Sequence, residues 1–274
     1  GDEIKIWGGS SEDKFTVENV TMSGGAVSIN GNGGADNFTV DNVSMTGGNI
    51  YVIGGNGNAN VSVSNIDKTA GYFDIDMGGS DSVASGNDTI YVENISNAYR
   101  AYFDIYARDG ADSISIKNST NEGYLRAWGG AGKDTITAEN ISISSSYGYF
   151  SIVGGADEDL ISVKGSTNVW AYGDEGNDTI SFENSSGGVY AGAGNDSVSI
   201  TKLVENSSGH FYGGEGNDTI EFYDTWIPYY NSYSGGGDVT GDEGDDLITA
   251  RNATIYGTGF FGGEGNDTIS VYDS

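Results

Sequence analysis

Aspartate recurs where a glycine-rich turn meets a short β-strand. Twelve such turns run along the chain, and eleven carry the aspartate: Asp13, Asp36, Asp88, Asp112, Asp134, Asp159, Asp178, Asp196, Asp218, Asp246 and Asp267. Ala59 holds the twelfth position. Carboxylates and backbone carbonyls are the oxygen ligands that Ca²⁺ prefers, and glycine allows the positive φ that turns carbonyls inward. We therefore expect several Ca²⁺ ions, each held between one turn and the identical turn of the next coil.

The predicted metal ligands comprise every junction aspartate except Asp13, together with glycines of the best-preserved turns. These glycines are Gly129, Gly132, Gly173, Gly176, Gly213, Gly216, Gly241, Gly244, Gly262 and Gly265. The turns at 8–15 and 154–161 lack the fourth-position glycine, so they could be plain glycine corners. His210 is the only histidine and the chain has no cysteine, which leaves zinc or copper almost without ligands.

The charge of the chain is compatible with bound cations. Against 40 Asp and Glu the chain has 11 Lys and Arg, for a net charge of −29 over 274 residues. Such a chain repels nucleic acid and anionic membrane surfaces, and no apolar stretch is long enough for membrane insertion. Eleven Ca²⁺ ions would add 22 positive charges and reduce −29 to −7. We expect the metal-free chain to be mostly unfolded, with binding and folding coupled.

The elements around each turn alternate with period two. Short strands such as 15–17, 38–40 and 90–92 follow the junction, and others such as 27–29 and 73–75 precede the turn. The residue seven before the junction is apolar in eleven of the twelve repeats, all except the one that ends at Asp88, so this column should face the core. The pattern predicts an all-β, right-handed parallel β-solenoid of about twelve coils without helices.

The predicted solenoid is a single domain, 1–274. Its coils over 1–170 are longer and should be three-sided, and those over 171–274 are shorter, with an inserted loop at 223–237. Because solenoid ends normally carry polar caps and these do not, we expect a fragment of a longer protein or a subunit that assembles end to end.

The turns resemble a known repeat. The pattern GGxGxDxUx, in which U is a large apolar residue, is similar to the nonapeptide of RTX (repeats-in-toxin) proteins. Asp134, Asp218 and Asp267 lie in full matches, and Asp178, Asp196 and Asp246 in near matches. The resemblance implies a Ca²⁺-binding β-roll of a bacterial protein that folds after secretion, at the cell surface or outside the cell. The motif appears once per coil here, which implies one column of ions instead of two.

Two further columns follow the repeat. Asparagine recurs after the first strand and is expected to form a ladder of amide hydrogen bonds, with glycosylation as the alternative: Asn19, Asn42, Asn65, Asn94, Asn118, Asn140, Asn184 and Asn252. Aromatic residues recur six before the junction and should point outward, where they could stack across coils or contact a glycan or partner: Trp7, Tyr106, Trp128, Tyr172, Tyr190, Tyr212 and Phe261.

The insertion at 223–237 is rich in aromatic residues. Trp226, Tyr229, Tyr230 and Tyr233 are candidates for ligand contact, because a long loop on a rigid scaffold is a frequent binding site. The same loop could equally lie flat over the solenoid as a cover.

We expect no enzymatic activity. The chain has no HExxH and no GxSxG, and paired carboxylates in glycine turns are better explained by metal ligation. The leading hypothesis is a calcium-binding extracellular structural repeat domain: a stalk, adhesin, surface-layer or filament component. The alternatives are a noncatalytic carbohydrate-binding module of a secreted polysaccharide-modifying enzyme and the repeat domain of a secreted toxin. Calcium, a second copy of the chain and surface glycans are the expected partners.

Overall fold

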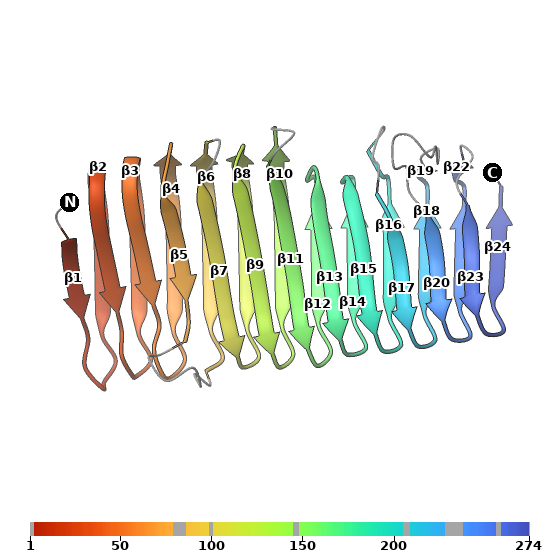
Figure 1. Ribbon diagram of the computed structural model, residues 1–274, viewed down its shortest axis with the longest axis horizontal. Helices are drawn as coiled ribbons and strands as arrows, with labels where there is room; N and C mark the ends of the chain where they lie inside the picture. Colours follow the sequence, from red (N-terminus) through yellow and green to blue (C-terminus); the bar gives the residue numbers. More distant parts are fainter. Residues whose placement is uncertain are drawn as a thin grey trace. The chain divides into compact units, whose positions relative to one another are not determined.

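The structure, a computed structural model, describes residues 3–78, 86–98, 101–144, 148–204, 209–227, 238–255 and 259–273. All elements in these ranges are β-strands, and strands with the same position in the repeat pair in parallel (Figure 1). The prediction of an all-β parallel solenoid without helices is confirmed for this part of the chain. The chain divides into two compact units, Gly1–Phe150 and Ser151–Ser274.

In the first unit, strands on the two sides of each coil alternate along the chain. They are β1 (Glu3–Trp7), β2 (Lys14–Asn30), β3 (Asn37–Ile53), β4 (Asn60–Lys68), β5 (Tyr72–Asp76), β6 (Thr89–Asn97), β7 (Tyr102–Asp109), β8 (Ser113–Asn121), β9 (Tyr124–Ala131) and β10 (Thr135–Ile143). β4, β6, β8 and β10 pair in succession on one side, and β5, β7 and β9 on the other. The long β2 and β3 pair along both sides.

In the second unit the coils are shorter. The strands are β11 (Tyr149–Ala156, which begins in the first unit), β12 (Leu160–Lys164), β13 (Val169–Glu175), β14 (Thr179–Glu183), β15 (Gly187–Ala193), β16 (Ser197–Thr201), β17 (Phe211–Glu215), β18 (Thr219–Tyr223), β19 (Trp226–Ile227), β20 (Val239–Glu243), β21 (Leu247–Arg251), β22 (Thr254–Ile255), β23 (Phe260–Glu264) and β24 (Thr268–Tyr272). Like strands again pair in register: β14 with β16, and β16 with β18.

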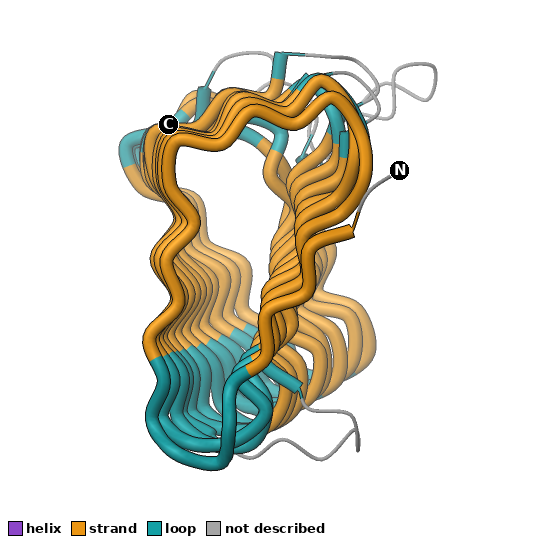
Figure 2. Tube along the Cα trace, turned by 90° about the vertical axis from the view of Figure 1, so that its left-hand side faces the viewer, coloured by secondary structure: helices purple, strands orange, loops and turns teal. Residues whose placement is uncertain are grey.

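The solenoid has about ten turns, slightly fewer than the about twelve coils predicted. The prediction counted glycine turns, and a row of turns encloses fewer complete coils than its own number. Figure 2 draws the strands of the coils in orange and the turns and loops that connect them in teal.

The core lies between the two strand layers of each coil. Alternation places every second residue inside, and the predicted apolar column is almost fully shielded: Ile29, Val52, Ile105, Ala127, Ile152, Ala171, Val189, Phe211 and Val239 are each no more than 1 % exposed. Ile6 and Phe260, in the first and last coils, are only half-buried.

Coil length differs between the units because of how the strand after the junction ends. In the first unit β4, β6, β8 and β10 have nine residues and continue past an asparagine with positive φ, such as Asn65 at 54° or Asn94 at 57°. In the second unit β12, β14 and β16 have five residues. Asparagine tolerates this left-handed conformation better than most residues.

The inserted loop was predicted to begin at residue 223, but in the structure the regular strands continue to residue 227. Tyr223 ends β18, and Trp226 and Ile227 form β19, which pairs in parallel with β22. Thr225 and Ile227 are buried, which explains why the chain stays in the coil here. Pro228, Tyr229, Tyr230 and Tyr233 lie outside the described residues. The described residues contain no helix able to cross a membrane.

Candidate metal centre

One carboxylate oxygen ties neighbouring coils together at nine junction aspartates: Asp36, Asp88, Asp112, Asp134, Asp178, Asp196, Asp218, Asp246 and Asp267. In each of them Oδ1 accepts a hydrogen bond from the backbone N–H of the preceding coil's junction residue, at distances from 2.6 to 3.0 Å. In the second unit, for example, Asp178 donates to Asp196 at 2.7 Å and Asp196 to Asp218 at 2.8 Å. These bonds fix each carboxylate in one orientation.

The second oxygen, Oδ2, points into the turn. It is buried and has no hydrogen-bond donor at Asp36, Asp112, Asp178, Asp196, Asp218 and Asp246. At Asp36, Asp178, Asp218 and Asp246 it faces a glycine five residues before the junction, which we call the inner position. A Cβ added at Gly213 would meet Oδ2 of Asp218, and at 2.6 Å it would meet the carbonyl oxygen of Gly241 in the next coil. At Gly213 a carboxylate oxygen and a backbone carbonyl therefore converge on space that a Cβ would fill. Before Asp112 and Asp196 this position is held by Ala107 and Ala191, whose Cβ atoms leave less room beside the carboxylate.

Burial makes these carboxylates costly to ionise. It raises the pKa of Asp88 and Asp196 to about 7, and the pKa of Asp112, Asp178 and Asp218 to about 6. The backbone N–H of the preceding coil lowers each pKa, but by less than burial raises it. A cation beside Oδ2 would stabilise the ionised form at neutral pH.

The donor set selects the kind of metal. No group of three or more His, Asp or Glu side chains is close enough to share an ion among the described residues. Carbonyls of the turns must therefore complete any coordination shell around a single carboxylate. Such an all-oxygen shell fits Ca²⁺ and does not fit zinc or copper, which favour nitrogen and sulfur. His210 stacks against Trp170 and Tyr212, away from the turns.

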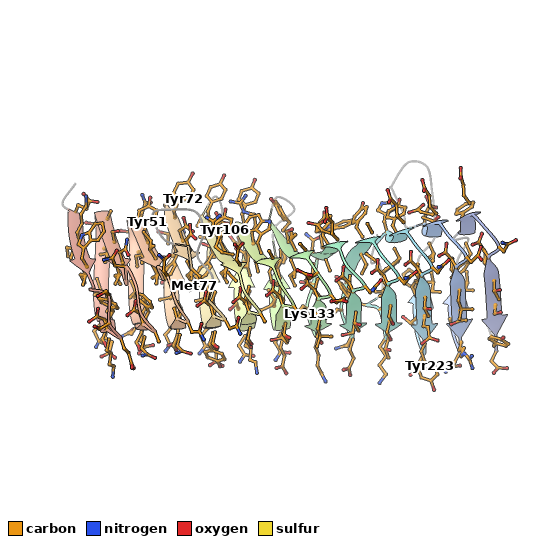
Figure 3. All side chains as sticks on the ribbon, turned by 90° about the horizontal axis from the view of Figure 1, so that it is seen from below. Tyr51, Tyr72, Met77, Tyr106, Lys133 and Tyr223 are labelled. Carbon is orange, nitrogen blue, oxygen red and sulfur yellow. The ribbon has the colours of Figure 1, made fainter. Side chains whose placement is uncertain are left out.

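The column is interrupted in the first unit. Ala59 replaces the aspartate there and is 2 % exposed. A Cβ on Gly54, the inner glycine of that turn, would lie 3.1 Å from the sulfur of the fully buried Met77. Figure 3 labels Met77 among the side chains of this unit. An apolar side chain therefore occupies the space beside Ala59, where the other turns place a carboxylate oxygen.

Asp13 also differs from the other junction aspartates. It is half-exposed, and its Oδ2 accepts a hydrogen bond of 2.7 Å from the N–H of Gly9. Unlike the buried aspartates listed above, Asp13 therefore has a donor for Oδ2, and its omission from the predicted ligands stays a prediction.

The predicted glycine ligands fall into two groups. Gly129, Gly173, Gly213, Gly241 and Gly262 hold the inner position beside the carboxylates. Gly132, Gly176, Gly216, Gly244 and Gly265 lie two residues before the junction with φ between 113° and 138°. At Gly216 a Cβ would overlap the carbonyl of Gly194 in the preceding coil, so glycine at this second position allows the turns to stack closely. That these glycines ligate metal stays a prediction.

The sequence reasoning missed a second ladder at the turn. The residue directly before the junction accepts a backbone N–H from the adjacent coil through its side chain. Asn177 accepts from Asn195 at 2.6 Å, and Asn195 accepts from Asn217 at 2.8 Å. The repeated Asn-Asp pair at 177–178, 195–196 and 217–218 was the available signal.

The predicted asparagine ladder is present, with substitutions. Asn42 donates to Asn19 at 2.6 Å, and Asn140 to Asn118 at 3.1 Å. Elsewhere a carboxylate replaces the amide acceptor: Asn252 donates to Asp224 at 2.9 Å. The eight asparagines have φ between 48° and 58°, a second reason for this residue type.

The outward aromatic column stacks across coils. Tyr106 and Trp128 lie 4.5 Å apart with an interplanar angle of 4°, and Tyr190 lies 5.2 Å from Tyr172 and 5.0 Å from Tyr212. The stacking interpretation is therefore confirmed for these rings. Trp7 and Phe261 are 65 % and 55 % exposed. Trp226 is half-buried in β19.

A network of charged groups on β5, β7 and β9 was also missed. Arg126 forms two hydrogen bonds to Asp104, at 2.7 and 2.6 Å, and Arg108 forms two to Asp76, at 2.8 and 2.7 Å. The fully buried Lys68 donates to the carbonyl of Tyr102, and burial lowers its pKa to about 7. The first unit thus neutralises part of its acidic charge with its own side chains.

Comparison with known proteins supports the fold described above. No protein-family model and no curated protein matches the sequence. Among solved structures, the chain is similar to the crystal structure of a hyperactive, Ca²⁺-dependent, β-helical antifreeze protein from an Antarctic bacterium. The identity is 22 %, the match covers 96 % of this chain and 83 % of that chain, and the TM-score is 0.50. This likeness supports the β-solenoid repeat and does not single out the RTX family.

Proposed function

We propose that the protein is a calcium-binding structural repeat domain of the bacterial exterior. In this proposal the chain folds when it meets Ca²⁺ after secretion, as in RTX-like repeats. It serves as a stalk, adhesin, surface-layer or filament segment and has no catalytic role. The crystal structure it resembles is itself described as Ca²⁺-dependent.

The observation that carries the proposal is the row of buried Oδ2 atoms without a donor. A buried carboxylate oxygen without a partner costs free energy, and a native fold rarely repeats that cost in coil after coil. Asp178, Asp196 and Asp218 repeat it in three successive turns. A divalent cation at each turn would remove the cost.

The ligands in this proposal are the Oδ2 atoms and carbonyls of the inner positions. Between two coils of the second unit they would be Asp218 Oδ2 and the carbonyl of Gly241, and then Asp246 Oδ2 and the carbonyl of Gly262. Ca²⁺ would supply positive charge inside the turn and cross-link adjacent coils. The chain's own groups orient the carboxylates through the Oδ1 hydrogen bonds described above.

The experiment is a Ca²⁺ titration of the EDTA-treated chain, followed by far-UV circular dichroism with light scattering in parallel. We expect a cooperative gain of β-structure, and a rise in scattering if coils also assemble end to end. A chain that has full β-structure in EDTA at pH 8 would contradict the proposal.

A pair of variants tests the site itself. Asp196→Asn keeps the Oδ1 acceptor but removes the charge, so the Ca²⁺ concentration at the midpoint should rise about tenfold, equivalent to about 1.4 kcal/mol. Asp245→Asn is the matched control, because this neighbouring carboxylate is exposed and accepts hydrogen bonds from Asn266. It should leave the midpoint unchanged.

A second candidate function is adsorption to ice. It is favoured by hydroxyl side chains in register on the outward face of the strands that follow the junction. In the second unit Thr179, Ser197 and Thr219 form one column, and Ser162, Ser181 and Ser199 the next. The similar structure belongs to an antifreeze protein. Thermal hysteresis of the calcium-loaded chain tests this candidate, and freezing at the equilibrium melting point would exclude it.

A further inference from the structure

In the first unit, arginine side chains cover the outward aromatic rings. The guanidinium of Arg108 lies 5.2 Å from the ring centre of Tyr106 and pairs with Asp76. That of Arg126 lies 5.2 Å from the ring centre of Trp128 and pairs with Asp104. Each arrangement has three parts: an aromatic ring, a guanidinium and a carboxylate.

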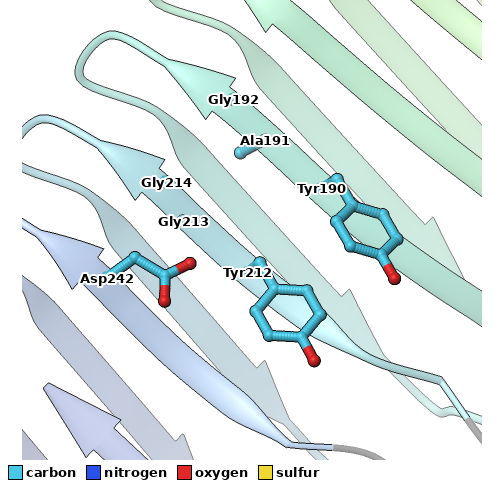
Figure 4. Close-up of a pocket in the computed structure, with 7 residues that line it drawn as sticks. All are labelled: Tyr190, Ala191, Gly192, Tyr212, Gly213, Gly214 and Asp242. Carbon is cyan, nitrogen blue, oxygen red and sulfur yellow. The ribbon is translucent and has the colours of Figure 1, made fainter. Parts of the chain in front are cut away.

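The second unit also places aromatic rings near a carboxylate, without a guanidinium; here Asp242 holds, in its own coil, the position that Arg108 holds in the first unit. Arg108 stands four residues before its junction, and in two coils of the second unit that position is held by Gly192 and Gly214. The missing side chains leave a depression of about 290 Å³ above the glycine backbone. Figure 4 shows Tyr190 and Tyr212 side by side on adjacent strands, with the Asp242 carboxylate beside them.

The surroundings of this groove are acidic. A second depression of about 470 Å³ shares Gly192, Gly214 and Asp242 with the first, and it is lined by four further carboxylates: Asp174, Glu175, Glu215 and Glu243. No lysine or arginine of the described residues lines either depression. The groove therefore attracts cations and repels anionic glycans and nucleic acid.

The second unit contains few lysine and arginine side chains. Over 151–274 the sequence contains three basic residues, against 21 Asp and Glu. Lys164 pairs with Glu183, and Arg251 lies over Tyr272. Lys202 follows β16 on the strand layer opposite the groove strands β15 and β17.

We propose that the groove formed by Tyr190, Tyr212 and Asp242 binds an arginine side chain of a basic polypeptide. The guanidinium stacks on the tyrosine rings and donates hydrogen bonds from its N–H groups to the Asp242 carboxylate. Arginine fits better than lysine because its planar group can stack and form two parallel hydrogen bonds at once. Aromatic rings give Ca²⁺ no ligand, and the side chains that would hold the guanidinium are distinct from the junction aspartates, although Ala191 and Gly213 of the inner positions also line the groove.

The test measures fluorescence anisotropy of a labelled (Gly-Arg)₄ peptide added to the calcium-loaded full chain at physiological salt. Matched (Gly-Lys)₄ and (Gly-citrulline)₄ peptides separate stacking and geometry from charge. We expect the arginine peptide to bind at least fivefold more tightly than the lysine peptide and the citrulline peptide not to bind. Tyr212→Ala and Asp242→Asn should each weaken binding about tenfold.

Two controls lie on β18, outside the groove. Tyr223 is 57 % exposed and Glu221 is also exposed, so Tyr223→Ala and Glu221→Gln remove the same kinds of group without touching the groove. Binding by both variants should equal that of the parent chain, with unchanged circular dichroism.

A gain-of-site variant keeps the proposal falsifiable if Tyr212→Ala does not fold. Arg108 has φ of 83°, which glycine accepts readily, so Arg108→Gly should open an equivalent groove beside Tyr106 and Asp76. The peptide stoichiometry should then rise from one to two. Equal binding of both cationic peptides to every variant would overturn the proposal in favour of non-specific attraction to the acidic chain.

Binding of a neutral oligosaccharide that depends on Tyr190 and Tyr212, without arginine-peptide binding, would also overturn it and identify the groove as a glycan site. Failure of the buried aspartates to bind calcium would leave the groove unaffected, because its lining side chains lie on the outer face. The two proposals therefore fail separately.

Discussion

The two units are built from one repeat but balance their charge differently. Over 1–150 the sequence has 19 acidic and 8 basic residues, and over 151–274 it has 21 and 3. The first unit uses Arg108 and Arg126 in ion pairs, and Met77 interrupts its column of carboxylates. The second unit carries a carboxylate at every junction. The comparison shows that the first unit offsets part of its acidic charge with its own side chains, so under the proposed calcium binding the second unit should depend more on added cations.

The largest expected effect is that of pH on the metal-free chain. Burial raises the folded-state pKa of Asp88 and Asp196 to about 7 and that of Asp178 and Asp218 to about 6. Because these values exceed the unfolded ones, the folded state binds more protons, and stability falls as pH rises from about 4 through about 7. In EDTA, β-structure should therefore be greater at pH 5 than at pH 8.

Hydrogen exchange with mass spectrometry can locate this loss. Residues 151–204 should lose protection before residues 37–76, because the column is interrupted at Ala59 in the latter. Saturating Ca²⁺ should remove the pH dependence between 6 and 8. Equal protection of both segments at pH 8 in EDTA would contradict the comparison.

The ion pairs of the first unit give the next effect. Arg126→Met leaves Asp104, which is 7 % exposed, without its guanidinium. Breaking such a buried pair should reduce the free energy of unfolding by about 3 kcal/mol. Chemical denaturation in saturating Ca²⁺ measures the change. The control is Lys164→Met in the second unit, where both members of the pair are over half exposed and a loss of no more than about 0.5 kcal/mol is expected.

The interruption at Ala59 can be turned into a site. Ala59→Asp alone places a carboxylate against Met77 and should cost about 2 kcal/mol. Combined with Met77→Gly it recreates the arrangement of the other turns, and equilibrium dialysis should find one more Ca²⁺ per chain. Met77→Gly alone should add none. A double variant as unstable as Ala59→Asp, with no added ion, would show that more than these two side chains defines the site.

The smallest effect concerns the ladder next to the junction. Asn195→Ala removes the acceptor for the N–H of Asn217 at an exposed position. Since water can replace the lost partner, thermal unfolding should reveal a loss of about 0.5–1 kcal/mol. A larger loss would mean that this ladder also orients the carboxylates.

Much of this structure could be predicted because the repeat imposes it. The apolar column that contains Val189 and Phe211, the junction position of Asp196 and the stacked Tyr190 each follow from period-two alternation at a fixed offset from the turn. Equivalent residues of successive coils must lie side by side, so a side-chain direction inferred for one coil applies to the others.

The features that could not be predicted depend on contacts between residues whose distance from the junction differs from coil to coil. Met77 follows Gly31 and Gly54 at the same 23-residue spacing and lies beside Gly54, but counting back from the junction at Asp88 misses it, because the sequence between them is longer than in the other repeats. The bond between Arg108 and Asp76 spans the same longer segment. Trp226 was assigned to a loop because a two-residue strand is too short for a periodic signal, although burial of Ile227 holds it in the coil.

The most direct test is a crystal structure grown with Ca²⁺, with anomalous scattering measured at a wavelength where calcium contributes. If the buried aspartates hold calcium, a row of anomalous peaks will follow Oδ2 of Asp178, Asp196, Asp218 and Asp246, with a gap beside Ala59. Absence of peaks at these oxygens, with the solenoid intact, would contradict a calcium column and leave the carboxylates as buried acids.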